Sequence, residues 1–166
     1  MLIGIGGISR AGKTTLAENM TKALKKMKKS VEVFCQDDFV KPKHALTKIE
    51  GVPDWERPNT VKWDSLISKV EKSTADVVIV EGLFSFYPAS IRSLYDKKLF
   101  LEIDENTFQN RKSADKRWTE EPGWYARHVW RSYNKYGKTK GNKEEYIFLD
   151  GSQPIDVKKL LETLMA

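Results

Sequence analysis

Hydrophobic residues along the chain gather in short runs that alternate with longer segments in which they recur every three or four positions. Short apolar runs bounded by polar residues or glycine are typical of strands. Such runs occur at Leu2–Ile5, Val31–Phe34, Val77–Val80, Leu99–Ile103 and Tyr146–Leu149. The third run, VVIV, is apolar at every position, as expected of a parallel strand that is buried on both faces. The pattern therefore predicts a parallel sheet of these five runs.

The segments between the runs carry apolar stripes at helical spacing, which predict amphipathic helices. The stripes comprise Leu16, Met20, Leu24 and Met27; Trp63, Leu66, Ile67 and Val70; Tyr125, Val129, Tyr133 and Tyr136; and Val157, Leu160, Leu161 and Leu164. We expect the second helix to begin near Asn59, and the tyrosine stripe to pack in the core rather than form a stacking platform. Alternating strands and helices predict a three-layer α/β/α fold around a five-stranded parallel sheet.

Two stretches show neither period: Val40–Pro58 and parts of Asn110–Gly123. Both follow the carboxyl ends of predicted strands, which is where open α/β sheets bind their ligands. His128 has no cysteine or second histidine nearby, so we expect it to be hydrogen-bonded rather than to bind a metal.

The first predicted strand leads into GGISRAGKTT, residues 6–15, which contains the pattern G-x-x-x-x-G-K-[ST] between a strand and a helix. Glycines let the backbone curl so that its N–H groups point inward, and the next helix begins with free N–H groups. Lys13 would reach the β- and γ-phosphates, and the Thr14 hydroxyl would bind Mg²⁺. The stretch therefore predicts a nucleotide-binding P-loop made of Gly7, Ser9, Arg10, Ala11, Gly12, Lys13, Thr14 and Thr15.

A P-loop alone does not decide between kinases, switches and motors, so the carboxylates after other strands carry the distinction. Asp37 and Asp38 follow the second strand in CQDDFVKP. Phosphoryl transfer to a hydroxyl needs a carboxylate near the attacking oxygen and a metal near the phosphates. Asp37 is the preferred general base and Asp38 the weaker candidate. Glu81 follows the third strand, where we expect it to act on Mg²⁺ directly or through water.

Two further segments carry candidate binding residues. Asp54, in GVPDWERP, could accept two hydrogen bonds from a vicinal diol such as that of a ribose; the alternative is a helix-entry loop in which Trp55 packs. Arg111 and Arg117, in NRKSADKRWTEEPGW, predict a lid near residues 110–123 that closes over the phosphates and excludes water. The alternative for this segment is an exposed basic helix.

The charge and cysteine content narrow the classes of function. The net charge is +6, and the basic excess between Glu105 and Lys140 is interleaved with Trp and Tyr, which suits a polyphosphate and, less well, a nucleic acid. Cys35 is the only cysteine, so no internal disulfide forms, as is usual in a reducing cytosol. No apolar run reaches the roughly 18–20 residues of a membrane span. We therefore expect a cytoplasmic protein that does not enter a membrane, and the pattern assigns no oligomeric state.

Several motifs occur together in a fixed order: GISRAGKTT, QDDFVKP, PDWERP, VIVEG, EPGWYARHVW and YIFLDGS. Over nearly its whole length the chain resembles the nicotinamide riboside kinases, within the uridine kinase and phosphoribulokinase group of P-loop kinases. QDDF followed by KP, together with PGWYARHVW, favours the nicotinamide riboside branch over the uridine kinases. The resemblance implies one P-loop kinase domain over residues 1–166. It also implies ATP- and Mg²⁺-dependent phosphorylation of a ribosyl 5′-hydroxyl, which gives nicotinamide mononucleotide.

The same resemblance implies roles for individual residues. Asp37 falls on the general base that also helps bind magnesium, and Thr14 and Glu81 fall on the metal-side threonine and the strand-end glutamate. Asp54 falls on the acid that holds the ribose hydroxyls, in a pocket that Asp38 and Phe39 line. Further implied contacts are Arg111 and Arg117 near ATP, Trp118 stacked on the nicotinamide ring, and the LDGS turn near adenine. Pro53 stands where the family often has an aromatic residue, and Trp55 would take over that stacking.

Two alternatives stay open at this point. One is a kinase for uridine, cytidine or another small hydroxyl compound, which an acceptor panel would distinguish. The other is a P-loop ATPase or switch that acts through a protein or nucleic-acid partner. The QDDF carboxylates and the arginine-bearing lid argue against the second alternative.

Overall fold

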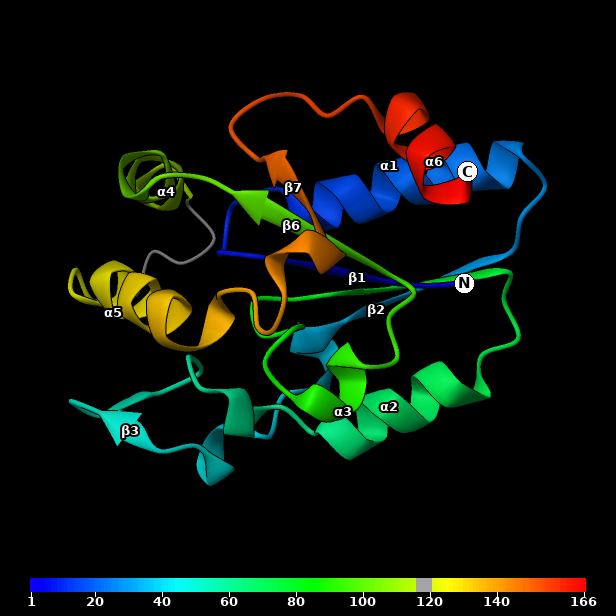
Figure 1. Cartoon of the computed structure of the whole chain (residues 1–166). Coiled ribbons are helices and arrows are strands. Elements are labelled where there is room, and N and C mark those ends of the chain that lie inside the picture. Colours follow the sequence, from blue (N-terminus) through cyan, green and yellow to red (C-terminus); the bar gives the residue numbers. More distant parts are fainter. Residues whose placement is uncertain (116–120) are drawn as a thin grey trace.

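A computed structural model describes residues 1–115 and 121–166. Within these residues, one five-stranded sheet has the order β2-β5-β1-β6-β7, and all its neighbouring strands are parallel (Figure 1). The strands are β1 (Leu2–Gly7), β2 (Val31–Cys35), β5 (Val77–Glu81), β6 (Lys97–Glu102) and β7 (Tyr146–Asp150). These confirm the predicted sheet. β5 is buried along its whole length, as its continuous apolar run predicts.

Helices lie on both sides of this sheet. The α-helices are α1 (Lys13–Lys26), α2 (Trp63–Lys72), α3 (Ala89–Arg92), α4 (Glu105–Ser113), α5 (Tyr125–Ser132) and α6 (Val157–Met165). Figure 1 shows α1 and α6 on one face and α2 and α3 on the other, which confirms the three-layer α/β/α fold. No helix within residues 1–115 and 121–166 is long and apolar enough to cross a membrane.

Short helical turns complete the chain between these elements. The 3₁₀ turns are η1 (Gln36–Phe39), η2 (Lys43–Ala45), η3 (Pro58–Thr60) and η6 (Lys143–Glu145), and a π-helical turn, η5 (Tyr133–Gly137), continues α5. The tyrosine stripe packs as predicted, since Tyr125 and Tyr133 are buried and only Tyr136 is half-buried.

Two helix predictions need correction. α2 begins at Trp63 rather than near Asn59, because Pro58–Thr60 forms a 3₁₀ turn and Val61 then pairs with Val40 in an isolated β-bridge. Met27 was expected on the buried stripe of α1, but α1 ends at Lys26 and half of the Met27 surface is exposed.

A small antiparallel hairpin lies in the first aperiodic stretch. It pairs β3 (Lys48–Ile49) with β4 (Val52–Pro53), and its turn residues Glu50 and Gly51 have φ values of 49° and 81°. Two consecutive positive φ angles are the geometry of a two-residue hairpin turn, which favours glycine. The hairpin lies beside α5 and apart from the main sheet (Figure 1).

Candidate active site

The P-loop joins the end of β1 to the start of α1. Gly7 has φ 139° and a Cβ there would lie 2.5 Å from the Leu101 carbonyl oxygen; Gly12, at the N-cap of α1, has φ 97°. Both positions therefore need glycine. The first N–H groups of α1 have no helical acceptors and face the turn of the loop, which suits them to bind phosphate oxygens.

Lys13 starts α1 and is buried within the loop. Its Nζ donates a hydrogen bond to the Ile8 carbonyl oxygen at 3.0 Å, so the ammonium bridges the two ends of the P-loop. Of the other predicted phosphate-binding residues, Ala11 is buried, Ser9 and Arg10 are half-buried, and Thr15 is exposed on the first turn of α1. The P-loop sequence therefore adopts the curled strand-to-helix form that its glycines predict.

Thr14 and Glu81 meet at the carboxyl edge of the sheet. Glu81 is the last residue of β5, lies in register with Ile5 and Cys35 of the adjacent strands, and is buried. The Thr14 Oγ1 donates a hydrogen bond to Glu81 Oε1 at 2.8 Å. A hydroxyl and a carboxylate are hard oxygen ligands of the kind that Mg²⁺ prefers, so these two residues fit a magnesium site completed by phosphates and water.

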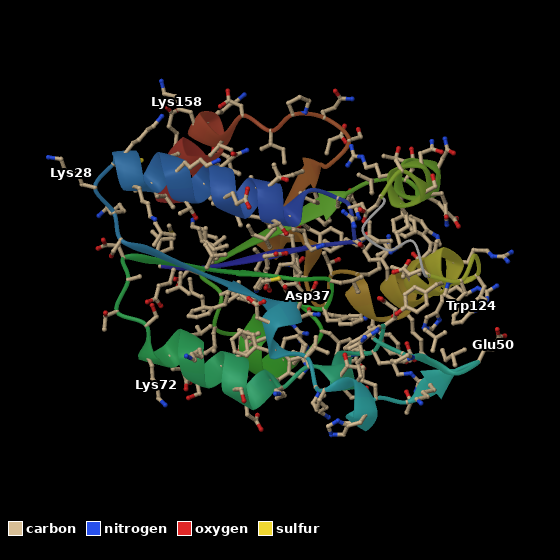
Figure 2. All side chains as sticks on the ribbon, turned by 180° about the vertical axis from the view of Figure 1, so that it is seen from behind. Lys28, Asp37, Glu50, Lys72, Trp124 and Lys158 are labelled. Carbon is tan, nitrogen blue, oxygen red and sulfur yellow. The ribbon has the colours of Figure 1, made fainter. Side chains whose placement is uncertain are left out.

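Asp37 lies in η1, directly after β2, close to this edge of the sheet (Figure 2). Although Asp37 keeps an exposed surface, partial desolvation by the surrounding protein atoms raises the pKa of its carboxyl group above the usual value; the Lys13 ammonium opposes this rise, and the negative charges of Glu81 and Asp38 add to it. The charges of the P-loop lysine and of the strand-end glutamate therefore both act on the Asp37 carboxyl group. This is the arrangement expected of a base beside a phosphate site.

A buried glutamine that sequence reasoning missed fixes the position of η1. The Gln36 Oε1 accepts a hydrogen bond from the Phe84 N–H at 2.8 Å. A Cβ at Gly82 would lie 2.4 Å from the Gln36 Cβ, so the turn after β5 can approach η1 this closely only because residue 82 is glycine. Asp37 is therefore anchored through its neighbour to the turn that follows Glu81.

Asp54 is fully buried at the end of the hairpin, and protein groups contact both of its oxygens. Oδ2 accepts from Arg57 Nε at 2.6 Å, and Oδ1 lies 2.8 Å from His128 Nε2 and accepts from the Glu56 N–H at 3.1 Å. Burial raises the pKa of Asp54, but the hydrogen bonds from His128 and Arg57 outweigh it and hold that pKa below its usual value. Asp54 thus links the loop after the hairpin to α5. His128 is hydrogen-bonded, as predicted.

Glu56 is a half-buried residue of the same loop that sequence reasoning missed. Its Oε1 accepts from the Tyr125 hydroxyl at 3.3 Å. Burial and the nearby negative charge of Asp37 raise the pKa of the Glu56 carboxyl group to about 7, against a smaller opposing effect of Lys112. No local motif could have identified it, because its neighbours come from η1, α4 and α5.

The other predicted substrate-binding residues lie in η1, in the loop after β4, or outside the described residues. Asp38 is exposed in η1, and Phe39 packs edge-on against Phe34 with ring centroids 6.4 Å apart. Trp55 is half-buried against the core. Arg117 and Trp118 fall at positions 116–120, outside the residues that the structure describes.

Arg111, at the end of α4, contacts the P-loop from the other side. Its Nη1 donates to the carbonyl oxygens of Arg10 and Gly151, each at 2.9 Å. The Arg10 side chain forms an ion pair with Asp115, just after α4. Arg111 therefore ties the P-loop to α4 and to the turn that follows β7.

Comparison with known proteins identifies the family. The model of the "Phosphoribulokinase / Uridine kinase family" matches residues 54–148, which is more than half of the chain. The chain belongs to this family. It is therefore an ATP-dependent phosphotransferase that acts on a hydroxyl group.

Individual relatives cover most of the chain. It is 28% identical to nicotinamide riboside kinase 2 of Mus musculus, over 91% of this chain and 87% of the relative, and 26% identical to nicotinamide riboside kinase 1 of Homo sapiens, over 92% and 84%. Uridine kinase of Schizosaccharomyces pombe is 30% identical, over 66% of this chain and 30% of the relative.

Solved structures share the fold at lower identity. An unliganded sugar kinase from Janibacter sp. HTCC2649 matches with a TM-score of 0.63 and 18% identity, over 99% of this chain and 91% of that chain. A possible uridine kinase from Bacillus stearothermophilus matches with a TM-score of 0.54 and 20% identity, over 90% and 88%. These likenesses confirm the P-loop kinase fold.

Proposed function

We propose that this enzyme phosphorylates the 5′-hydroxyl of a riboside, with nicotinamide riboside as its preferred acceptor and nicotinamide mononucleotide as the product. The observation that carries the proposal is the position of Asp37 in η1, at the carboxyl edge of the sheet, where the charges of both Lys13 and Glu81 act on its carboxyl group. The nicotinamide riboside kinase relatives, matched over about nine-tenths of the chain, support this acceptor.

In the proposed reaction the P-loop holds the donor. The N–H groups at the start of α1 and the Lys13 ammonium bind the β- and γ-phosphate oxygens, and Lys13 exchanges its bond to the Ile8 carbonyl for a bond to phosphate. Thr14, Glu81 and Asp37 would hold Mg²⁺, which when bound neutralises charge on the phosphates.

Asp37 activates the acceptor in this proposal. Its carboxylate accepts the proton of the 5′-hydroxyl as that oxygen attacks the γ-phosphorus, and the bond from phosphorus to the leaving β–γ bridging oxygen breaks. Because its pKa is raised, the Asp37 carboxylate is a stronger proton acceptor than an aspartate with the usual pKa. The η1 residues Asp38 and Phe39 line the ribose side of the acceptor in this proposal. Asp54, which is fully buried and bonded to Arg57 and His128, would bind the ribose hydroxyls by exchanging one of these protein hydrogen bonds.

The segment at residues 110–123 closes over the donor as a lid. Arg111 already contacts the P-loop backbone, so closure brings little rearrangement at α4. Arg117 adds charge over the phosphates, and Trp118 and Trp55 stack on the base of the acceptor. We further propose that residues 1–166 act as one kinase domain, located in the cytoplasm.

A kinase for uridine or cytidine is the second candidate, favoured by the uridine kinase relatives. The test is a panel of nicotinamide riboside, uridine, cytidine and a simple sugar, each with Mg·ATP, with the phosphorylated product measured directly. The proposal predicts the highest kcat/KM for nicotinamide riboside. Product from uridine but none from nicotinamide riboside would replace the first candidate with the second.

A further inference from the structure

The loop after β4 carries a carboxylate, Glu56, that the mechanism above does not use. We propose that Glu56 contacts the base of the acceptor and selects acceptors whose base carries a positive charge. This inference rests on the proposed riboside kinase function. It assigns the enzyme's selection among acceptors to Glu56, which lies outside both the P-loop and η1.

Hydrogen bonds at both ends fix the backbone of Glu56. Its N–H donates to Asp54 Oδ1 at 3.1 Å, and its carbonyl oxygen accepts from the Ser132 hydroxyl on α5. Asp54 is in turn held by Arg57 and His128. The fixed backbone and the contact of the carboxylate with the Tyr125 hydroxyl together limit where the side chain can lie, so the carboxylate can serve as a preorganised contact.

The carboxyl group of Glu56 has little compensation for its charge in the ionised form. The Tyr125 hydroxyl donates to it at 3.3 Å, which is long for an O–H···O bond. Among residues 1–115 and 121–166, no lysine or arginine forms an ion pair with it. Lys112 lies near enough to attract it, but its Nζ pairs with Glu121 at 2.7 Å. A cationic ligand would therefore supply a partner that the described protein residues do not.

Glu56 is bonded through its N–H to Asp54, the residue proposed to hold the ribose, and the negative charge of Asp37 raises the pKa of the Glu56 carboxyl group. The acceptor hydroxyl must reach Asp37, so a group attached to the same ribose can lie near Glu56. A cationic ring there relieves the repulsion between the two carboxylates, whereas a neutral ring leaves it unchanged. Nicotinamide riboside carries a pyridinium charge on its base and uridine carries none, so charge distinguishes the two candidate acceptors.

The test compares two ribosides that share a ring shape but differ in charge. These are nicotinamide riboside and its reduced, neutral dihydronicotinamide form, each measured with wild type and with Glu56→Gln. Glutamine keeps the size of the side chain and its ability to accept from Tyr125, so only the charge is removed. The matched control is Glu50→Gln, because Glu50 is an exposed glutamate at the hairpin tip, far out from Asp37 (Figure 2).

We expect Glu56→Gln to lower kcat/KM for nicotinamide riboside by about tenfold, equivalent to about 1.4 kcal/mol, and to change it for the reduced riboside by less than about twofold. Equilibrium binding of the two ribosides without ATP should show the same difference, and Glu50→Gln should behave as wild type with both. Equal losses with both acceptors, or no loss with either, would overturn the role of Glu56. Failure of wild type to phosphorylate either riboside would instead overturn the proposed function, and this inference with it.

Discussion

Thr14 Oγ1 donates a hydrogen bond to Glu81 Oε1 at 2.8 Å, although 67 residues separate the two along the chain. The first lies at the start of α1 and the second ends β5, so the contact exists only because β1 and β5 are adjacent parallel strands. Parallel pairing brings the carboxyl ends of both strands to one edge, which is where the loops of such sheets bind ligands. The sheet topology thus assembles the proposed metal side of the site.

Replacing Thr14 with alanine should raise the Mg²⁺ concentration that gives half-maximal activity by about tenfold, because one of the oxygen ligands is lost. The measurement is the rate at saturating ATP and acceptor over a Mg²⁺ titration. Thr21→Ala is the control, since Thr21 lies further along α1 and its hydroxyl donates only to the Ala17 carbonyl. An unchanged Mg²⁺ requirement would remove Thr14 from the metal site.

Lys13→Ala should lower kcat/KM by more than about a hundredfold, because the ammonium that stabilises charge on the transferred phosphoryl group is removed. Thermal unfolding should stay close to wild type, since the lost hydrogen bond to Ile8 is a single contact. Lys22→Ala, at an exposed position of the same helix, serves as control. Near-normal turnover in Lys13→Ala would contradict the phosphate-binding role of the loop.

Arg111→Ala should destabilise the fold by about 2 kcal/mol, because the charged hydrogen bonds of the guanidinium to backbone carbonyl oxygens are lost. It should also raise the KM for ATP, since the P-loop loses its tie to α4. Urea unfolding and ATP kinetics measure the two effects, with the exposed Arg131→Ala on α5 as control. A lower free energy of unfolding with an unchanged KM for ATP would mean that Arg111 stabilises the fold but does not contribute to ATP binding.

The hydrogen bonds of Asp54 with Arg57 and His128 should make the free energy of unfolding depend on pH. The pKa of this carboxyl group is lowered in the folded protein, so its contribution is complete above the unfolded value of about 3.9 and is lost as the pH falls through the folded value. Asp54→Asn should therefore be less stable than wild type at pH 7, and the difference should shrink below about pH 4. Urea unfolding at several pH values tests this, and a constant difference would contradict it.

The sheet and the P-loop could be predicted because their signals are local. An apolar run such as VVIV specifies a buried strand without knowledge of its neighbours, and G-x-x-x-x-G-K-[ST] specifies a backbone conformation through its glycines. The shared location of the carboxylates that follow the strands could be predicted from the topology alone, because parallel strands have their carboxyl ends at one edge of the sheet. Asp37 and Glu81 were identified in this way.

The acceptor side of the site was harder to predict. The hairpin has strands of two residues each, which are too short to show an alternating pattern. The sequence around Asn59 also did not indicate that Pro58–Thr60 would form a 3₁₀ turn instead of the start of a helix. The contact between Asp54 and His128 joins positions 74 apart that no shared motif links. Glu56 owes its electrostatic environment to three separate elements, so only the folded chain shows it.

The central claim is that Asp37 removes the proton of the acceptor hydroxyl beside the P-loop, and the kcat of Asp37→Asn with nicotinamide riboside tests it most directly. ATP binding is measured separately by calorimetry, and Asp64→Asn, at an exposed position on α2, is the control. The account predicts a fall in kcat of about 10²- to 10⁴-fold with ATP still bound. A kcat within about twofold of wild type would contradict it.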